Sequence, residues 1–150
     1  MILADANVLV YAINTRAPQH RASRAFIEAV QKKQVDGVLV PQVLLEFFAI
    51  VTDHRRIDQP LGAEEAWEQV KLLKMIFPIR DESLNALGNL MDAITEGMVK
   101  GGGIFDAFLV AQMRACGISL ICTYNIRDFK SYKGVVAHTP ESLGFQPDNV

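Results

Sequence analysis

Short runs of apolar residues alternate along the chain with longer segments in which apolar positions recur at helical spacing. A strand that is buried on both faces has no polar side, so a short continuous apolar run is typical of the centre of a parallel sheet. Runs of this kind predict buried strands at 2–4, 38–40 and 118–122, a further strand at Val135–Val136, and a short one at Pro78–Ile79.

Helical spacing predicts five helices between these strands, at 18–33, 41–54, 64–76, 83–98 and 104–115. Pro18 and Pro41 stand at first helical positions. Ser83 is placed as an N-cap and Gly117 as a C-cap, and three glycines after Lys100 separate the last two helices. Short buried strands that alternate with helices predict an α/β fold, in which helices cover both faces of a parallel sheet.

The composition narrows the class of protein. Half of the 150 residues are apolar, which is enough for the packed core of one domain without disulfides. A formal net charge of −2 argues against a protein that coats nucleic acid nonspecifically. It does not exclude a small basic face on part of the surface. The two cysteines do not form a CxxC pair and only three histidines are present, which disfavours a zinc site. Cys116 and Cys122 have apolar neighbours, which favours packing over a disulfide.

The beginning of the chain does not resemble an export signal. The segment MILADANVLVYA has no basic residues before its apolar part and contains Asp5. No uninterrupted apolar run approaches the roughly 18 residues of a membrane helix. We therefore expect a soluble cytoplasmic protein.

Acidic residues stand beside strongly apolar stretches at the ends of predicted elements or just inside a helix: Asp5, Glu46, Asp106 and Asp128. Sites in open parallel sheets form beyond the carboxyl ends of the strands, so these side chains are predicted to converge on one rim. Carboxylates that share a poorly solvated cleft repel one another and raise one another's pKa. A hard divalent cation, Mg²⁺ or Mn²⁺, bound by oxygen ligands would remove that repulsion.

Each of these acids also fits an ordinary structural role. Asp5 fits a cap of the following turn, with Asn7 hydrogen bonded to its carboxylate. Asp106 interacts favourably with the dipole of the helix that it begins. Glu46 fits the narrow exposed stripe of its helix, and Asp128 fits a turn cap. The residues alone leave both interpretations open.

The segments DANVLVYA, PQVLLEF, FDAFLVAQM and TYNIRDF resemble, in their order and spacing, the motifs of PIN-domain nucleases. They are most similar to the VapC-type toxin ribonucleases of bacterial and archaeal toxin–antitoxin pairs. The resemblance runs from Met1 to about Leu143, so it implies a PIN domain over 1–143 and a C-terminal tail over 144–150. The fold that it implies is a three-layer α/β arrangement, with a central parallel sheet of four to five short strands flanked by helices.

The resemblance implies a Mg²⁺- or Mn²⁺-dependent endoribonuclease that hydrolyses RNA phosphodiester bonds as the toxin of a type II toxin–antitoxin pair. The implied catalytic and metal-binding acids are Asp5, Glu46, Asp106 and Asp128. Asn125 is a further implied ligand. It stands where many members have an aspartate, and its amide still offers an oxygen. Asn7 and Thr123 are predicted to support these ligands through hydrogen bonds.

The partners that the resemblance implies are an RNA substrate, a cognate antitoxin and a second copy of the chain in a homodimer, with no membrane. The antitoxin would place a helix in an apolar groove drawn from two adjacent helices, with contributions from Phe47, Phe48, Ile50, Val51, Trp67 and Leu72. Arg16, His20 and Arg24 are spaced four residues apart, and Lys100 lies beside the glycines. Both a contact with RNA phosphates and plain solvation fit these four residues.

Two other functions stay open at this point. A PIN-like domain that no longer catalyses would serve as a binding or scaffold module, although the presence of all three main acids argues against it. A phosphatase that uses Asp5 as a covalent nucleophile would need a second aspartate two residues further on. This chain has Asn7 at that position, which makes the phosphatase the weaker alternative.

Overall fold

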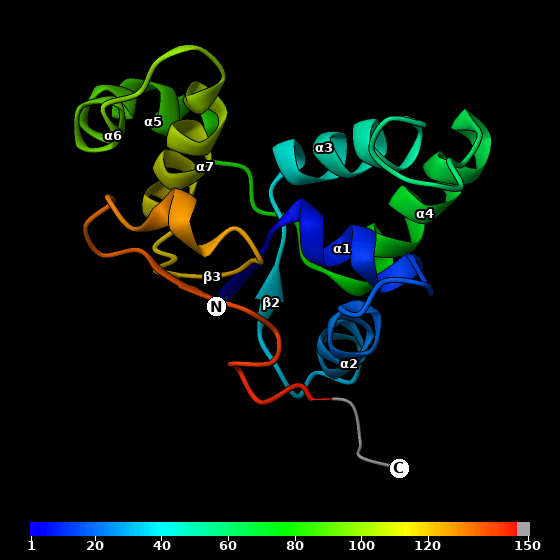
Figure 1. The fold of residues 1–150 in the computed structure, drawn as a ribbon. Helices are drawn as coiled ribbons and strands as arrows, with labels where there is room; N and C mark the ends of the chain where they lie inside the picture. Colours follow the sequence, from blue (N-terminus) through cyan, green and yellow to red (C-terminus); the bar gives the residue numbers. More distant parts are fainter. Residues whose placement is uncertain (147–150) are drawn as a thin grey trace.

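In the computed structural model, which describes residues 1–146, four short strands form one sheet (Figure 1). Their order is β2-β1-β3-β4, with bounds β1 (Ile2–Ala4), β2 (Gly37–Val38), β3 (Leu120–Cys122) and β4 (Val136–His138). Every neighbouring pair is parallel, so the predicted parallel sheet is confirmed. The expected strand at 78–79 is reduced to a single parallel bridge between Leu39 and Ile79. Residues 147–150 of the predicted tail lie outside the described part.

Helices lie on both sides of the sheet, which confirms the predicted three-layer α/β arrangement (Figure 1). One group is α1 (Ala6–Ile13), α2 (His20–Gln31), α3 (Pro41–Val51) and α4 (Ala63–Ile76). The other is α5 (Ser83–Gly88), α6 (Leu90–Gly97) and α7 (Ile104–Ala115). Two short 3₁₀ helices, η1 (Gly101–Gly103) and η2 (Ile126–Phe129), precede α7 and follow β3. Within residues 1–146, none of the helices has both the length and the apolar character of a membrane-spanning segment.

The hydrophobic core is built on both faces of the sheet. Leu3, Val38 and Ile121, one from each of three strands, are at most 1% exposed. Around them pack fully buried aromatic side chains: Phe26, Phe47, Phe77 and Phe129. Burying a side chain of this kind contributes about 1.5–3 kcal/mol relative to leaving it exposed. Burial on both faces explains why the strands appear in the sequence as continuous apolar runs. Cys116 and Cys122 are free thiols, as expected.

Helix α1 is the element that the apolar pattern does not predict. It contains Val8 and Val10, whose β-branched side chains lower helix propensity. Two features outweigh that preference. The Asp5 side chain caps the helix, because Oδ1 accepts a hydrogen bond from the Ala6 backbone N (2.8 Å). In addition, five of its eight residues are buried. Capping and tertiary burial therefore decide the conformation of this segment.

The single helix expected at 83–98 is two helices, α5 and α6. The chain leaves helical geometry at Asn89, with φ −113° and ψ 13°, directly after Gly88. Glycine and asparagine both have low helix propensity, and their succession explains the break. Ser83 is the first residue of α5 rather than its N-cap, and its backbone N donates to Asp81 Oδ1 (3.1 Å).

Candidate functional site

Asp5 lies at the junction of β1 and α1 and is 7% exposed. Besides the bond from Ala6, its Oδ2 accepts hydrogen bonds from Thr123 Oγ1 (2.7 Å) and Asn7 Nδ2 (3.2 Å). Burial raises the pKa of the Asp5 carboxyl, these hydrogen bonds oppose the rise, and repulsion from Asp128 adds to it. The cap and the hydrogen bond from Asn7, both expected from the sequence, are present.

Thr123 connects the ends of β1 and β3. It is fully buried, and its hydroxyl donates to Asp5 while it accepts from Asn7 Nδ2 (3.1 Å) and the Asn125 backbone N (3.0 Å). Asn7 Oδ1 in turn accepts from the Tyr124 backbone N (3.0 Å). Asp5, Asn7 and the chain after β3 are therefore held by one partly buried hydrogen-bond network.

Replacing Thr123 by valine removes the hydroxyl and keeps the size of the side chain. We expect the free energy of unfolding at neutral pH to fall by about 1–3 kcal/mol, because buried donors lose their acceptor and Asp5 loses a donor. Urea denaturation measures the change. The matched control is Thr123→Ser, which keeps the hydroxyl. A serine variant as unstable as the valine variant would contradict this explanation.

Glu46 lies in the second turn of α3 and is partly exposed. Its Oε1 accepts a hydrogen bond from Gln42 Nε2 (2.8 Å), one helical turn earlier. Burial is the largest cause that raises the pKa of the Glu46 carboxyl. The bond from Gln42 opposes the rise, and the charges of Asp5 and Asp106 add to it.

Asp106 lies in the first turn of α7, as expected. Burial raises its pKa to about 6, with further contributions from the charges of Asp128 and Asp5. Asp128 lies in η2, Asn125 is the residue before η2, and both are exposed. The structure thus places Asn125 and Asp128 just beyond the carboxyl end of β3.

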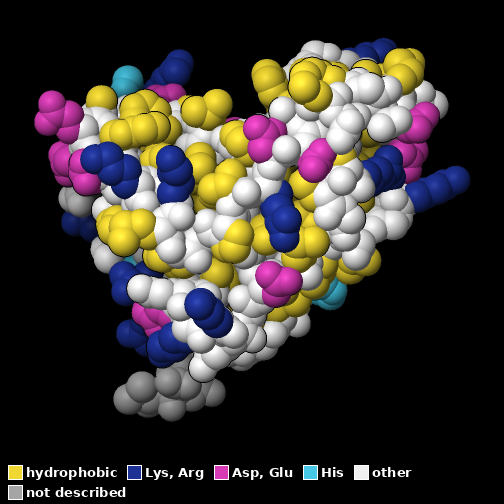
Figure 2. Space-filling model, turned by 180° about the vertical axis from the view of Figure 1, so that it is seen from behind, with side chains coloured by type: hydrophobic (Ala, Val, Ile, Leu, Met, Phe, Trp, Pro, Cys, Tyr) yellow, Lys and Arg dark blue, Asp and Glu magenta, His cyan; other side chains and the backbone are white. Residues whose placement is uncertain are grey.

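The four predicted acids lie in one region: the charge of Asp128 raises the pKa of Asp5 and of Asp106, and the charges of Asp5 and Asp106 raise the pKa of Glu46. Figure 2 shows acidic side chains at the base of a notch between the part formed by α3 and α4 and the part formed by α5 and α6. Within residues 1–146, however, no three His, Cys, Asp or Glu side chains stand close enough to hold a metal ion together. The acids share a region without forming a closed ligand set.

The chemistry of these donors fits a hard divalent cation. All candidate ligands are carboxylate or amide oxygens, the type that Mg²⁺ and Mn²⁺ prefer. Within residues 1–146, the charged groups that shift the pKa of Asp5, Glu46 and Asp106 are other carboxylates, which raise it. The region therefore concentrates negative charge.

Two glutamines beside these acids were missed by the sequence analysis. Gln42 donates to Glu46, and Gln112 in α7 donates from Nε2 to Gln42 Oε1 (2.7 Å). The available signal was weak. Gln112 is one polar residue within an apolar helical segment, and Gln42 precedes Glu46 by four residues, the spacing of neighbours on a helix.

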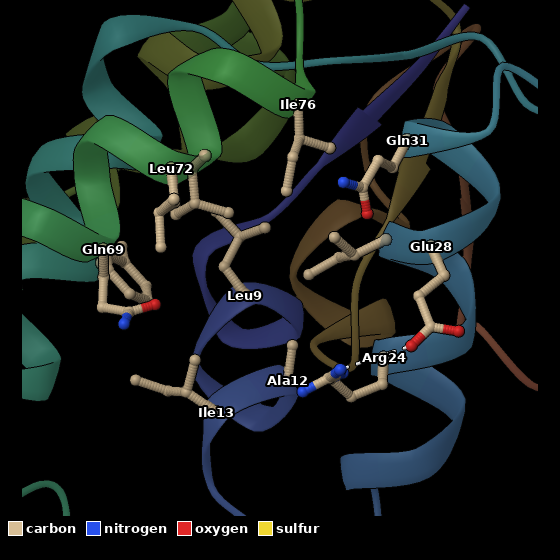
Figure 3. A pocket seen from close by; sticks show the side chains of 12 residues that line it. Leu9, Ala12, Ile13, Arg24, Glu28, Gln31, Gln69, Leu72 and Ile76 are labelled. Atoms are coloured by element: carbon tan, nitrogen blue, oxygen red, sulfur yellow. Dashed lines mark hydrogen bonds and ion pairs between the residues drawn. The ribbon is translucent and has the colours of Figure 1, made fainter.

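Of the candidate RNA-binding residues, Arg16, His20 and Arg24 were expected on one face of a helix, and the structure does not place all three on one helix. Helix α2 begins at His20, two residues later than expected, so Arg16 lies in the preceding loop. His20 Nδ1 lies 2.9 Å from the Tyr11 carbonyl. Arg24 lines a mostly apolar cavity between α1, α2 and α4 and forms an ion pair with Glu28 (3.4 Å), as Figure 3 shows. Lys100 is exposed directly before η1.

A second apolar hollow of about 470 Å³ lies between α3 and α4 and includes Leu45, Phe48 and Trp67. Trp67 is 49% exposed and Leu45 is 67% exposed. The residues expected to line one partner groove lie in different parts of the structure. Phe48 and Trp67 line this hollow, whereas Phe47 and Val51 are fully buried in the core. Leu72 lines the cavity of Figure 3 instead.

Comparison with known proteins identifies the family. Residues 2–135 match the PIN domain family, so the chain belongs to that family. One curated relative is Ribonuclease VapC24 of Mycobacterium tuberculosis (strain H37Rv). It is 25% identical over 138 residues, which cover 88% of this chain and 91% of the relative.

Solved structures of toxin–antitoxin complexes share the fold. A chain of VapBC2 from Rickettsia felis, bound to a promoter DNA fragment, superposes with a TM-score of 0.66 at 20% identity. The match covers 93% of this chain and 98% of that one. A chain of a toxin–antitoxin complex from Klebsiella pneumoniae gives a TM-score of 0.61, with the same identity and coverage. At this identity the likeness concerns the fold, and it confirms the PIN-like arrangement expected from the sequence.

Proposed function

We propose that this chain is a divalent-metal-dependent endoribonuclease and the toxin of a type II toxin–antitoxin pair. The observation that carries the proposal is the convergence of Asp5, Glu46 and Asp106, whose pKa values are all raised, in a PIN-domain chain. The similarity to a VapC ribonuclease, and to chains from toxin–antitoxin complexes, supports the choice of RNA as substrate and of the toxin role.

In this proposal Mg²⁺ or Mn²⁺ would be held, directly or through bound water, by five side chains: Asp5, Glu46, Asp106, Asn125 and Asp128. Such a cation supplies water of lowered pKa and neutralises the charge that grows on the phosphate oxygens. Asp5, held by Thr123 and Asn7, is the rigid member of the set. Glu46 and Asp106 are more exposed than Asp5, so either carboxylate can accept the proton of the attacking water. Lys100 is exposed directly before η1 and six residues before Asp106, and we assign it to an RNA phosphate.

The proposed antitoxin binds as an amphipathic segment in the hollow of Leu45, Phe48 and Trp67. Large apolar side chains that form a contiguous exposed patch mark an interaction surface. A separate group of such side chains lies on α5 and α6, where Leu84 is 84% exposed and Met91 is 67% exposed. We assign this second surface to the homodimer.

The test is cleavage of total RNA by the purified chain in Mg²⁺, in Mn²⁺ and in EDTA. Discrete fragments that form with metal and are absent in EDTA are the expected result. Mapping the new ends identifies the bond that is cut. RNA that stays intact in both metals would overturn the proposal and leave a scaffold or binding role as the better description.

A further inference from the structure

The amide of Gln112 is buried in α7 and needs a specific partner. Gln112 is 1% exposed, and burying an amide without a hydrogen-bond partner is strongly unfavourable. Nε2 donates to Gln42 Oε1 (2.7 Å) and, at longer range, to the Phe108 carbonyl (3.4 Å). The short bond runs from α7 to the first turn of α3, so it crosses between the two helix groups of Figure 1.

The amide of Gln42 is fixed by three groups. Its nitrogen donates to Glu46 Oε1 (2.8 Å) and to the Phe105 carbonyl (2.9 Å), while its oxygen accepts from Gln112. A flipped amide would turn its oxygen toward two acceptors and its nitrogen toward a donor. The neighbours of Gln42 therefore allow only one orientation.

Gln42 connects the segments that carry Glu46 and Asp106, two of the predicted metal ligands. Gln42 binds the Glu46 carboxylate directly, and it binds the backbone of Phe105, the residue before Asp106. The two carboxylates repel each other, and that repulsion favours separation of α3 from α7. A neutral amide between them holds the geometry without cancelling the charge that a cation needs. A lysine at the same place would compete with the metal.

We propose that Gln42, anchored by Gln112, is a positioning residue that sets the place of the Glu46 carboxylate relative to Asp106. The inference rests on the proposed metal-dependent function. It adds a role for two glutamines that stand in the same sequence segments as Glu46 and Asp106, PQVLLEF and FDAFLVAQM. Residues that orient metal ligands typically change metal affinity by about 10–100-fold when they are replaced.

The test compares the parent with Gln42→Met, Gln112→Met and the double variant, by calorimetric titration with Mn²⁺ and by melting of the metal-free proteins. Methionine keeps the length of the side chain and removes the amide. Each single variant leaves one amide without its partner, so both should melt at lower temperature than the parent. The double variant removes both amides, and its melting temperature should recover toward the parental value.

Affinity for Mn²⁺ separates positioning from stability. We expect Gln42→Met and the double variant to bind Mn²⁺ about 10–100-fold more weakly than the parent, although the double variant regains stability. Gln69→Met is the matched control: Gln69 lies in α4 and lines the cavity of Figure 3, so this variant should bind Mn²⁺ as the parent does. Parental affinity in Gln42→Met, or affinity that recovers together with stability in the double variant, would overturn the inference.

The proposed function fails in a different way. A parent chain that binds no Mn²⁺ and cuts no RNA overturns the metal-dependent nuclease, and this inference with it. A parent that binds Mn²⁺ and loses that binding in Asp106→Asn, while Gln42→Met binds unchanged, overturns the positioning role alone.

Discussion

Replacing Asp106 by asparagine is expected to lower the rate of RNA cleavage by about 10²–10³-fold and to leave the fold intact. The amide has nearly the size of the carboxylate, and the residue is partly exposed in the first turn of α7, so little packing changes. What the substitution removes is a negative charge and a strong oxygen ligand. Single-turnover cleavage of one RNA by parent and variant, at equal concentration in Mn²⁺, measures the loss.

The same substitution should make the metal-free protein more stable at neutral pH. The pKa of Asp106 is raised to about 6, so above that pH its ionised carboxylate is less favourable in the folded chain than in the unfolded one. Glu64→Gln is the matched control, because it removes one exposed charge from the start of α4. It should change neither cleavage nor the response to metal. An Asp106→Asn protein that cuts as fast as the parent would refute the assigned role.

Elements with local signals were predictable from the sequence. Helix α7 spans 104–115 as expected, because its apolar spacing, the glycines before it and Gly117 after it are all local features. Gly117 adopts φ 70°, the left-handed region that ends helices and favours glycine. The buried strands were visible as apolar runs for the same reason. Helix α1 was not, because its stability comes from burial against other elements rather than from its own propensity.

The part of the acidic region that follows from the topology of the sheet was predictable from the sequence. The carboxyl ends of neighbouring parallel strands meet at one edge, which places Asp5 near the residues that follow β3. The two glutamines depend on contacts that no spacing reveals. Gln42 meets Phe105 across 63 residues and Gln112 across 70. Whether two polar residues so far apart in the sequence make contact depends on how α3 packs against α7. The pattern of apolar and polar residues along the chain does not determine that packing.

Protons and divalent cations should compete for the same acidic region, because both bind ionised carboxylates. Burial and mutual repulsion raise the pKa of Asp5, Glu46 and Asp106, the last from 3.8 to about 6. Between these two pH values the folded metal-free chain holds protons that the unfolded chain releases. The contribution of these groups to stability is therefore largest at low pH and falls as pH rises through this window.

Adding Mn²⁺ is accordingly expected to raise the melting temperature strongly near pH 7.5 and weakly near pH 5. A ligand at 100 times its dissociation constant stabilises by about 2.7 kcal/mol, or about 5–10 °C for a domain of this size. Melting curves in Mn²⁺ and in EDTA at the two pH values measure the difference.

The Glu96–Arg114 ion pair has the opposite effect on how stability depends on pH. It lowers the pKa of Glu96 to about 2, so its contribution to stability is lost as pH falls below 4.5. Both pH values of the comparison lie above 4.5, so the contribution of this ion pair is present at each and does not affect the result. A shift of equal size at both pH values, or one that persists in Asp106→Asn, would show that Mn²⁺ binds elsewhere.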